Sequence, residues 1–139
     1  MRRTRKRSKM SKRNELTSAQ KKGLNIQRSM GMIAGAGSGK TLVLTERFIK
    51  IMDKFFHAGK SADEALRAIV GITFTRKAAS EMASRIAKRC EELATSDSEG
   101  ADFWHEAAMR MAETRVGTIH SFCGQIIKTF PAIISWPIF

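Results

Sequence analysis

The chain has 139 residues, a formal net charge of +12 and two cysteines, Cys90 and Cys123. This length allows one domain at most. The two cysteines exclude a disulfide framework and no Cys/His spacing indicates zinc, so we expect a reduced, cytoplasmic setting. No apolar signal region follows the basic start, and the most apolar segment, residues 129–139, is too short to span a bilayer. We therefore expect no membrane partner.

Residues 1–15 are predicted to form a disordered basic tail, because they are rich in Lys and Arg and almost free of apolar side chains. Of the 25 Lys and Arg in the chain, ten lie within residues 1–22. Such a tail could follow the phosphate backbone of a nucleic acid. A solvated basic extension or a misassigned start codon explains the same residues.

The first predicted helix covers residues 18–25. Thr17-Ser18-Ala19-Gln20 has the S/T-x-x-E/Q form of a capping box, with Thr17 as the cap. After this helix we predict a strand over residues 27–33, although Arg28, Ser29 and Gly31 interrupt the apolar run that a buried parallel strand needs.

Residues 34–41 have the pattern of a phosphate-binding loop, G-x-x-x-x-G-K-[ST], with alanine in place of the first glycine. Small residues let backbone N–H groups converge on phosphate oxygens, Lys40 supplies a charge to the β and γ phosphates, and the Thr41 hydroxyl can ligate Mg²⁺. A plain glycine-rich turn is the alternative. The predicted nucleotide site comprises Ala34, Gly35, Ala36, Gly37, Ser38, Gly39, Lys40 and Thr41.

Two long helices are predicted from apolar residues at three- and four-residue spacing. The first begins near Gly39 and aims its N-terminus at the phosphates. Its apolar stripe consists of Leu44, Phe48, Ile51, Met52 and Phe55. The second helix follows residue 75, and its stripe consists of Ala79, Met82, Ile86, Cys90 and Leu93.

Shorter elements complete the predicted order. Residues 61–64 cap a brief helical turn, and residues 66–75 form a strand rich in β-branched and aromatic side chains. The pattern Ser96-x-x-Glu99 is predicted to cap a helix that reaches Met111. Residues 114–119 form a third predicted strand, and a last helix over residues 122–130 stops at Pro131.

Helices and strands alternate along the chain, which predicts an α/β fold with a parallel sheet and helices on both faces. Ligands of such sheets bind at the carboxyl ends of the strands. Three segments, residues 34–41, 73–77 and 117–121, each join the end of a predicted strand to the start of a helix. We expect all three to lie at one edge of the sheet.

Four blocks of sequence, residues 16–20, 34–47, 72–82 and 117–123, together resemble the amino-terminal region of UvrD/Rep-type superfamily 1 DNA helicases. The nearest flavour is the helicase component of helicase-nuclease complexes, such as AddA or RecB. The resemblance implies that residues 16–139 are an incomplete ATP-binding domain with the RecA-like P-loop NTPase fold. It also implies ATP and Mg²⁺ as cofactors and a role in DNA repair or recombination. The implied partners are single-stranded DNA and a nuclease or second helicase-nuclease subunit.

The resemblance implies roles for individual residues. Gln20 would read the adenine ring, although a capping-box amide that reaches back to Thr17 explains the same residue and would exclude the adenine contact. Lys40 and Thr41 would be the catalytic residues of the loop. The two remaining blocks would contact single-stranded DNA through Thr73, Phe74, Thr75, Arg76, Thr118, His120 and Ser121.

Three of these DNA contacts need comment. The family usually has asparagine where this chain has Arg76, and an arginine can still bind phosphate or stack on a base. Phe74 could equally be a core residue that ends its strand. We assign His120 no proton-transfer role, because a lone histidine more often makes structural hydrogen bonds.

The acidic pair that ATP hydrolysis needs at the end of an apolar strand is not found in this sequence. The only Asp-Glu dipeptide, Asp63-Glu64, suits the first turn of a helix. The resemblance therefore implies the first part of a motor, and we expect that these residues alone cannot unwind a duplex. A truncated relic that binds nucleotide or nucleic acid without turnover is the alternative function. A small P-loop kinase would leave the residue 72–82 and 117–123 blocks unexplained.

Overall fold

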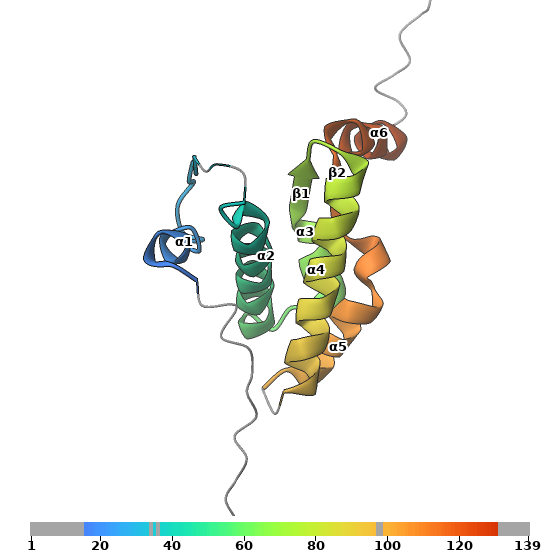
Figure 1. Cartoon of the computed structure of the whole chain (residues 1–139). Helices are drawn as coiled ribbons and strands as arrows, with labels where there is room; N and C mark the ends of the chain where they lie inside the picture. Colours follow the sequence, from blue (N-terminus) through green and yellow to red (C-terminus); the bar gives the residue numbers. More distant parts are fainter. Residues whose placement is uncertain (1–15, 34, 36, 97–98, 131–139) are drawn as a thin grey trace, which may run out of the picture.

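The computed structural model describes residues 16–33, 35, 37–96 and 99–130 (Figure 1). The predicted basic tail, Ala34, Ala36 and the predicted stop at Pro131 lie outside these residues. In chain order the elements are α1 Ser18–Lys22, α2 Lys40–His57, α3 Ala62–Ala68, β1 Val70–Thr73, α4 Arg76–Thr95, α5 Ala101–Met109, the short 3₁₀ helix η1 Met111–Glu113, β2 Arg115–Thr118 and α6 Ile119–Thr129.

Local side-chain chemistry sets where four of the helices begin. The predicted capping boxes of α1 and α3 are both present, because the Thr17 and Ser61 hydroxyls accept hydrogen bonds from the backbone of Gln20 and Glu64, whose side chains bond back to the caps. The hydroxyls of Thr75 and Thr118 cap α4 and α6.

Strands β1 and β2 pair in parallel, with Ile72 opposite Gly117, which confirms the predicted parallel pairing of these two segments. Helix α4 packs on the face where Met82 lies close to Gly71. On the other face the side chains of Val70 and Ile72 remain 39% and 50% exposed. Within the described residues, then, helices do not cover both faces of the sheet equally.

The core lies where α2, α3, α4 and α5 meet. The predicted stripe of α4 is confirmed, because its four residues from Ala79 to Cys90 are buried. The buried face of α2 is rotated from the prediction: Val43 and Ile49 are buried, whereas Leu44 is 45% exposed. The largest fully buried side chains are Met52, Leu66, Ile86, Val43 and Cys90.

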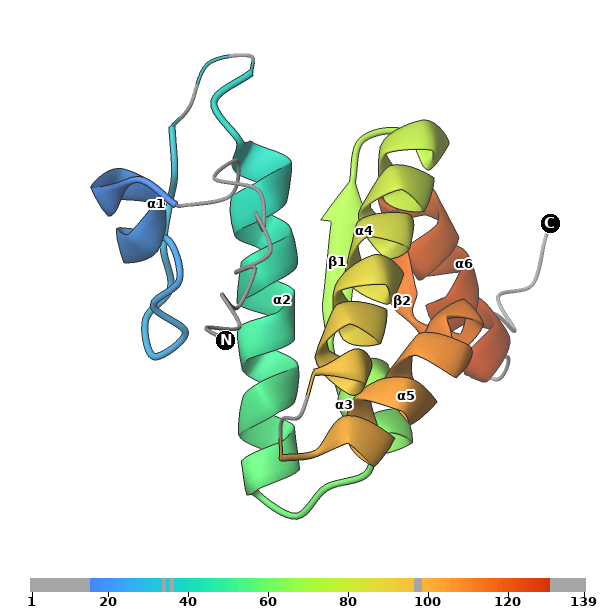
Figure 2. The same ribbon diagram turned by 60° about the horizontal axis from the view of Figure 1, so that its bottom comes forward.

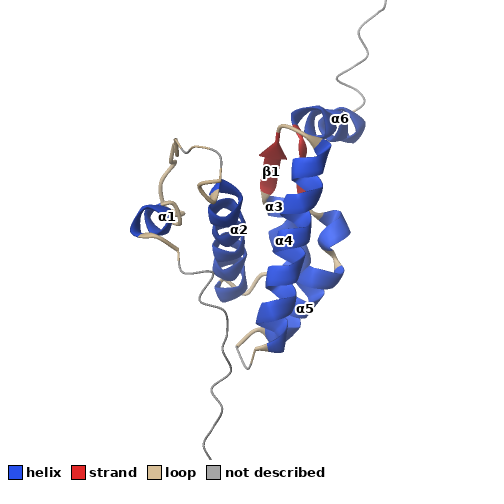
Figure 3. Cartoon of the chain, viewed as in Figure 1, coloured by secondary structure: helices blue, strands red, loops and turns tan. Residues whose placement is uncertain are grey.

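Residues 27–33 form turns and loop, so the predicted strand before the phosphate-binding loop is wrong (Figure 3). A strand needs a neighbouring strand to bond its N–H and C=O groups, and in the described part of the chain the only sheet is that of β1 and β2. Ile33 is fully exposed. The polar and glycine interruptions at Arg28, Ser29 and Gly31 were therefore the stronger signal.

Other element boundaries differ from the predictions because of tertiary contacts. Helix α1 is shorter than expected, and α3 is longer, so that Leu66 is buried in a helix and not in a strand. Ser96 ends α4, its hydroxyl donating a 2.7 Å hydrogen bond to the carbonyl of Leu93, and it does not cap the next helix. Helix α5 instead begins after Gly100, whose φ of 88° and close approach to the Phe56 ring both exclude a side chain.

Figures 1 and 2 place the N-terminus of α2 on the same side of the molecule as the carboxyl end of β1, with α1 beyond α2 on the side away from the sheet. The register brings the carboxyl ends of β1 and β2 together, as expected for two of the three predicted junctions. The phosphate-binding loop reaches this side through α2 and not through a strand. Among the described helices, none is both long and apolar enough to cross a membrane.

Candidate functional site

The loop before α2 closes on the carbonyl oxygen of Gly35. This oxygen accepts hydrogen bonds from the Ser38 hydroxyl at 2.7 Å and from the Lys40 ammonium at 3.1 Å. Gly37 and Gly39 have φ angles of 75° and 81°, a left-handed conformation that a β-carbon disfavours. A β-carbon built on Gly35 or Gly37 would meet no atom within 4 Å. The loop thus needs glycine for its shape and has open space beside it.

The helices that begin on this side of the molecule favour anions. The first turns of α2, α4 and α6 contain no acidic residue, whereas α3 and α5 carry Asp63, Glu64 and Asp102 in theirs. A helix N-terminus presents unpaired N–H groups and a partial positive charge. Because Lys40 is the first residue of α2, its ammonium and the helix dipole act in the same region, as phosphate binding requires.

The side chain of Gln20 joins α1 to the phosphate-binding loop. Its Oε1 accepts a 2.8 Å hydrogen bond from the backbone N–H of Thr17, and its Nε2 donates one of 3.0 Å to the carbonyl of Ser38. The capping role is therefore present. A carboxamide has two N–H donors and two lone pairs on its oxygen, so one of each remains for an adenine ring. The two roles considered for Gln20 are compatible.

Arg47 on α2 is a residue that the sequence analysis missed. Its guanidinium donates hydrogen bonds to the carbonyls of Gly23, Asn25 and Arg28, at 2.9, 2.6 and 3.2 Å. The available signal was an arginine placed at helical spacing within the apolar stripe of α2, three residues after Leu44. Arg47 therefore fastens the segment that joins α1 to the loop.

The predicted DNA contacts at the ends of β1 and β2 lie together, because Thr73 pairs with Thr118 in the sheet. Their hydroxyls already have structural partners. That of Thr73 donates to the carbonyl of Thr75 at 3.0 Å, and those of Thr75 and Thr118 accept from the backbone N–H groups of Ala78 and Ser121. The threonines thus shape this edge, and a ligand would meet their remaining lone pairs and the backbone beside them.

Phe74 is 100% exposed, so the alternative that it is a core residue is wrong. Arg76, His120 and Ser121 are exposed beside it on the first turns of α4 and α6. A fully exposed aromatic ring next to an arginine offers a stacking surface and a phosphate contact, the two elements from which single-stranded nucleic acid sites are built.

Asp63 and Glu64 belong to the first turn of α3, as predicted. The Asp63 carboxylate lies 2.8 Å from Arg67 and 2.9 Å from Arg110, and the hydrogen bond from Arg67 is the main cause that lowers its pKa. The backbone N–H of Ser61 does the same for the pKa of Glu64. Among the described residues, no group of three or more His, Cys, Asp or Glu side chains could hold a metal ion.

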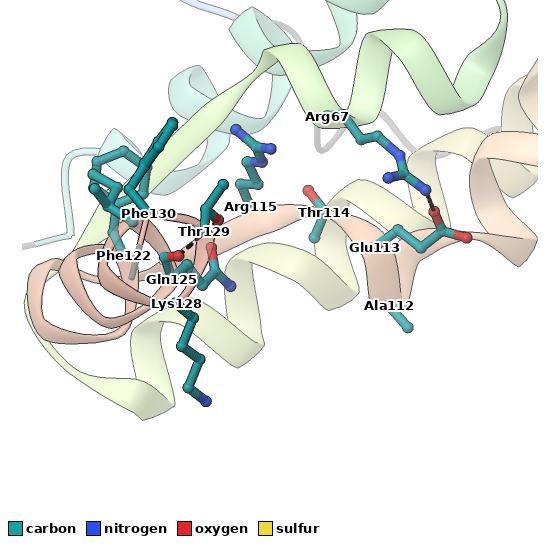
Figure 4. A pocket seen from close by; sticks show the side chains of 11 residues that line it. Arg67, Ala112, Glu113, Thr114, Arg115, Phe122, Gln125, Lys128, Thr129 and Phe130 are labelled. Carbon is teal, nitrogen blue, oxygen red and sulfur yellow. Dashed lines mark hydrogen bonds and ion pairs between the residues drawn. The ribbon is translucent and has the colours of Figure 1, made fainter. Parts of the chain in front are cut away.

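A hollow of about 630 Å³ lies between α6 and the start of β2 (Figure 4). Phe122 and Phe130 give it an apolar side, and the ion pair of Arg67 with Glu113 lies at another side. The hollow is reached from the amino-terminal end of β2, whereas the predicted contacts follow its carboxyl end, and none of the predicted site residues lines it. It is therefore separate from the candidate site.

The fold and the site define an α/β protein with a glycine-rich anion-binding loop at a helix N-terminus. The profile of the UvrD/REP helicase N-terminal domain matches residues 16–136. The chain belongs to this family.

Relatives named as the A-type subunit of an ATP-dependent helicase/nuclease share this sequence. That of Ligilactobacillus salivarius is 38% identical over 125 residues, which are 87% of this chain and 9% of the relative. That of Limosilactobacillus fermentum is 37% identical over 112 residues, 78% of this chain and 8% of the relative. That of Natranaerobius thermophilus is 35% identical over 98 residues, 70% of this chain and 7% of the relative. The chain thus spans 7% to 9% of the length of these curated relatives.

Proposed function

We propose that this chain is the ATP-binding amino-terminal part of an ATP-dependent DNA helicase, in which ATP hydrolysis drives movement along single-stranded DNA. The observation that carries the proposal is the loop before α2, where left-handed Gly37 and Gly39 precede Lys40 at a helix N-terminus with no acidic residue in its first turn. Membership of the UvrD/REP family supports it, as do the names of the relatives.

In this proposal the loop has the P-loop NTPase role and holds the triphosphate of ATP. The residues fit such a ligand, because there is open space beside Gly35 and Gly37 and the Lys40 ammonium already reaches across the loop to a carbonyl oxygen. Lys40 would exchange that oxygen for phosphate oxygens, and Thr41 would ligate Mg²⁺. The bound Mg²⁺ supplies charge neutralisation at the phosphates. Gln20 would contact adenine with its remaining donor and acceptor.

Single-stranded DNA would lie along the carboxyl ends of β1 and β2. Phe74 offers a ring for base stacking, Arg76 a cation for phosphate, and the first turn of α6 the N–H groups and hydroxyl of Ser121. Because β1 leads into α4 and β2 into α6, a nucleotide-driven movement of this edge would reach both contact sets together. The proposed protein partner is a nuclease or second helicase-nuclease subunit.

Nucleotide binding without turnover is the second candidate for this polypeptide. The observation that favours it is the place of Asp63-Glu64, the only Asp-Glu pair in the sequence, in ion pairs and a capping box of α3. Neither carboxylate is therefore in position to orient a water molecule at the phosphates. Hydrolysis by the helicase would then need carboxylates from beyond these residues.

Calorimetric titration of the chain with Mg-ATP tests the proposal. We expect saturable binding that falls at least about tenfold in Lys40→Ala, since a charge-assisted phosphate contact contributes more than about 1.4 kcal/mol. Lys50→Ala, an exposed charge further along the same helix, is the matched control and should bind like the wild type. Equal affinity of wild type and Lys40→Ala would refute the loop assignment. Phosphate release and strand displacement, measured in parallel, separate binding alone from turnover and unwinding.

A further inference from the structure

We propose that Arg47 is a positioning residue for base recognition, which places the Gln20 amide beside the phosphate-binding loop by holding the segment after α1 against α2. The inference rests on the proposed function, because it concerns how the ATP site distinguishes the base from the triphosphate. Arg47 itself lies on the outer part of α2 and would touch neither the base nor the phosphates.

The first observation is the set of bonds that one guanidinium makes. Nη1 donates to the carbonyls of Gly23 and Asn25, and Nη2 donates to that of Arg28. The rigid fork of an arginine can serve several acceptors at fixed angles, whereas a lysine presents a single flexible ammonium. Hydrogen bonds with a charged donor are also stronger than neutral ones. These bonds therefore fix the path of residues 23–28 as a unit.

The second observation is how the same segment meets α2 and folds on itself. A β-carbon on Gly23 would lie 2.8 Å from Cγ1 of Val43, so the backbone lies directly on α2 at this point. The N–H groups of Leu24, Asn25 and Gln27 are bonded within the turn, to Lys21, Lys22 and the Asn25 side chain. The turn supplies its own acceptors in this way, and Arg47 supplies donors for its outward carbonyls.

The third observation is that α1 has no core contacts that would hold it in place. The helix is five residues long and contains no buried residue. Figures 1 and 2 show it on the side of α2 that faces away from the sheet. Its position therefore depends on its ends. One end is the bond from Gln20 to Ser38, and the other is the turn that Arg47 holds.

Loss of Arg47 should accordingly release α1 and leave the phosphate-binding loop intact. The loop has its own bonds to the Gly35 carbonyl, and Lys40 and Thr41 belong to α2, which is held by Phe48 and Met52 in the core. The consequence is a split between two ligands. Binding of Mg-ATP should weaken because the base contact is lost, whereas binding of Mg-tripolyphosphate, which has no base, should remain.

The experiment compares both ligands by calorimetry on the full chain. In Arg47→Met we expect the affinity for Mg-ATP to fall about tenfold, which corresponds to about 1.4 kcal/mol, and the affinity for Mg-tripolyphosphate to stay within about twofold. Arg47→Lys keeps the charge and should lose most of the same ATP affinity, because one ammonium cannot serve three carbonyls. Lys50→Met removes a charge from the same helix and should change neither affinity. Retained tripolyphosphate binding reports that each variant is folded.

A double-mutant cycle with Gln20→Ala identifies the route of the effect. If Arg47 acts through Gln20, Arg47→Met should cause almost no further loss of ATP affinity in the Gln20→Ala background. Additive losses would overturn the inference, as would an equal loss of ATP and tripolyphosphate binding in Arg47→Met, or unchanged ATP affinity. Wild-type protein that binds neither ligand would refute the proposed function together with this inference, and is thereby distinguished from a failure of the Arg47 inference alone.

Discussion

The side chain of Gln20 donates a 3.0 Å hydrogen bond from Nε2 to the carbonyl of Ser38, within the glycine-rich loop. The same side chain closes the capping box of α1 through Oε1. A helix cap and a phosphate-binding loop are thus joined by one amide. The base-binding and phosphate-binding parts of the proposed ATP site are therefore coupled before any ligand binds.

Substitution of Gln20 by glutamate should separate the cap from the base contact. A carboxylate still accepts from the Thr17 N–H, as capping boxes with Glu do, but it cannot donate to adenine or to Ser38. We expect the preference for ATP over GTP to fall about fivefold, the equivalent of about one hydrogen bond, in a fluorescent-nucleotide competition assay. Thr17→Ala, which removes the cap hydroxyl and keeps the amide, is the control. A preference that changes in Thr17→Ala and not in Gln20→Glu would contradict a base-reading role.

Alanine at Gly39 should do more harm than alanine at Gly37. Both glycines are left-handed, so each substitution strains the loop by about 1–2 kcal/mol and weakens binding of Mg-ATP. Only at Gly39 would the new β-carbon also lie 2.6 Å from Nε2 of Gln20 and displace it. We therefore expect Gly39→Ala alone to alter the ratio of ATP to tripolyphosphate affinity.

Gly124 is the matched control for these glycine substitutions. It lies inside α6 with no atom within 4 Å of a built β-carbon, so Gly124→Ala should raise the free energy of unfolding by about 0.5–1 kcal/mol and leave nucleotide binding unchanged. The same ATP to tripolyphosphate ratio in both loop variants would contradict the contact between Gly39 and Gln20.

Phe74→Ala should weaken binding of single-stranded DNA without loss of stability. A stacked base contributes about 1–3 kcal/mol, so the dissociation constant for a fluorescein-labelled oligothymidylate should rise at least about fivefold in anisotropy titrations. The free energy of unfolding should change by less than about 0.5 kcal/mol, because the ring is 100% exposed. Met109→Ala, which removes another exposed apolar side chain, should not affect binding. Unchanged anisotropy in Phe74→Ala would remove this residue from the DNA site.

The two cysteines should differ in reactivity. Burial raises the pKa of the Cys90 thiol from 9.0 to about 12, whereas Cys123 is exposed. A thiol reagent at pH 8 should therefore label one thiol in the native chain and two after denaturation. Because the unfolded thiol loses its proton first, stability should fall as the pH rises from 9.0 towards 12. Cys90→Ala should reduce that slope in urea denaturation curves, and rapid native labelling of both thiols would contradict the burial.

Features that depend on neighbouring residues in the chain could be read from the sequence. The capping boxes at Thr17 and Ser61 and the buried stripe of α4 are of this kind, because a cap or a helical face is defined within a few residues. The family blocks were likewise recognised from contiguous residues, and the family match to residues 16–136 agrees with them.

Features that depend on distant partners could not be read in this way. The apolar content of residues 27–33 favoured a strand, but a strand forms only where another backbone accepts its hydrogen bonds. Leu66 has a residue type that suits either a strand or a helix, and its complete burial among α2, α4 and α5 decided for the helix. The partners of Arg47 lie 19 to 24 residues away, and no local pattern names them.

The sequence by itself determined the glycine-rich loop, the helix caps and the family, because each is encoded by short runs of residue types whose chemistry acts locally. Only the tertiary structure decided that Thr73 and Thr118 lie side by side, that Phe74 is exposed, and that Gln20 and Arg47 hold α1 to the loop. These relationships depend on hydrogen bonds and burial between segments far apart in the chain, whose energies exist only once the segments have met.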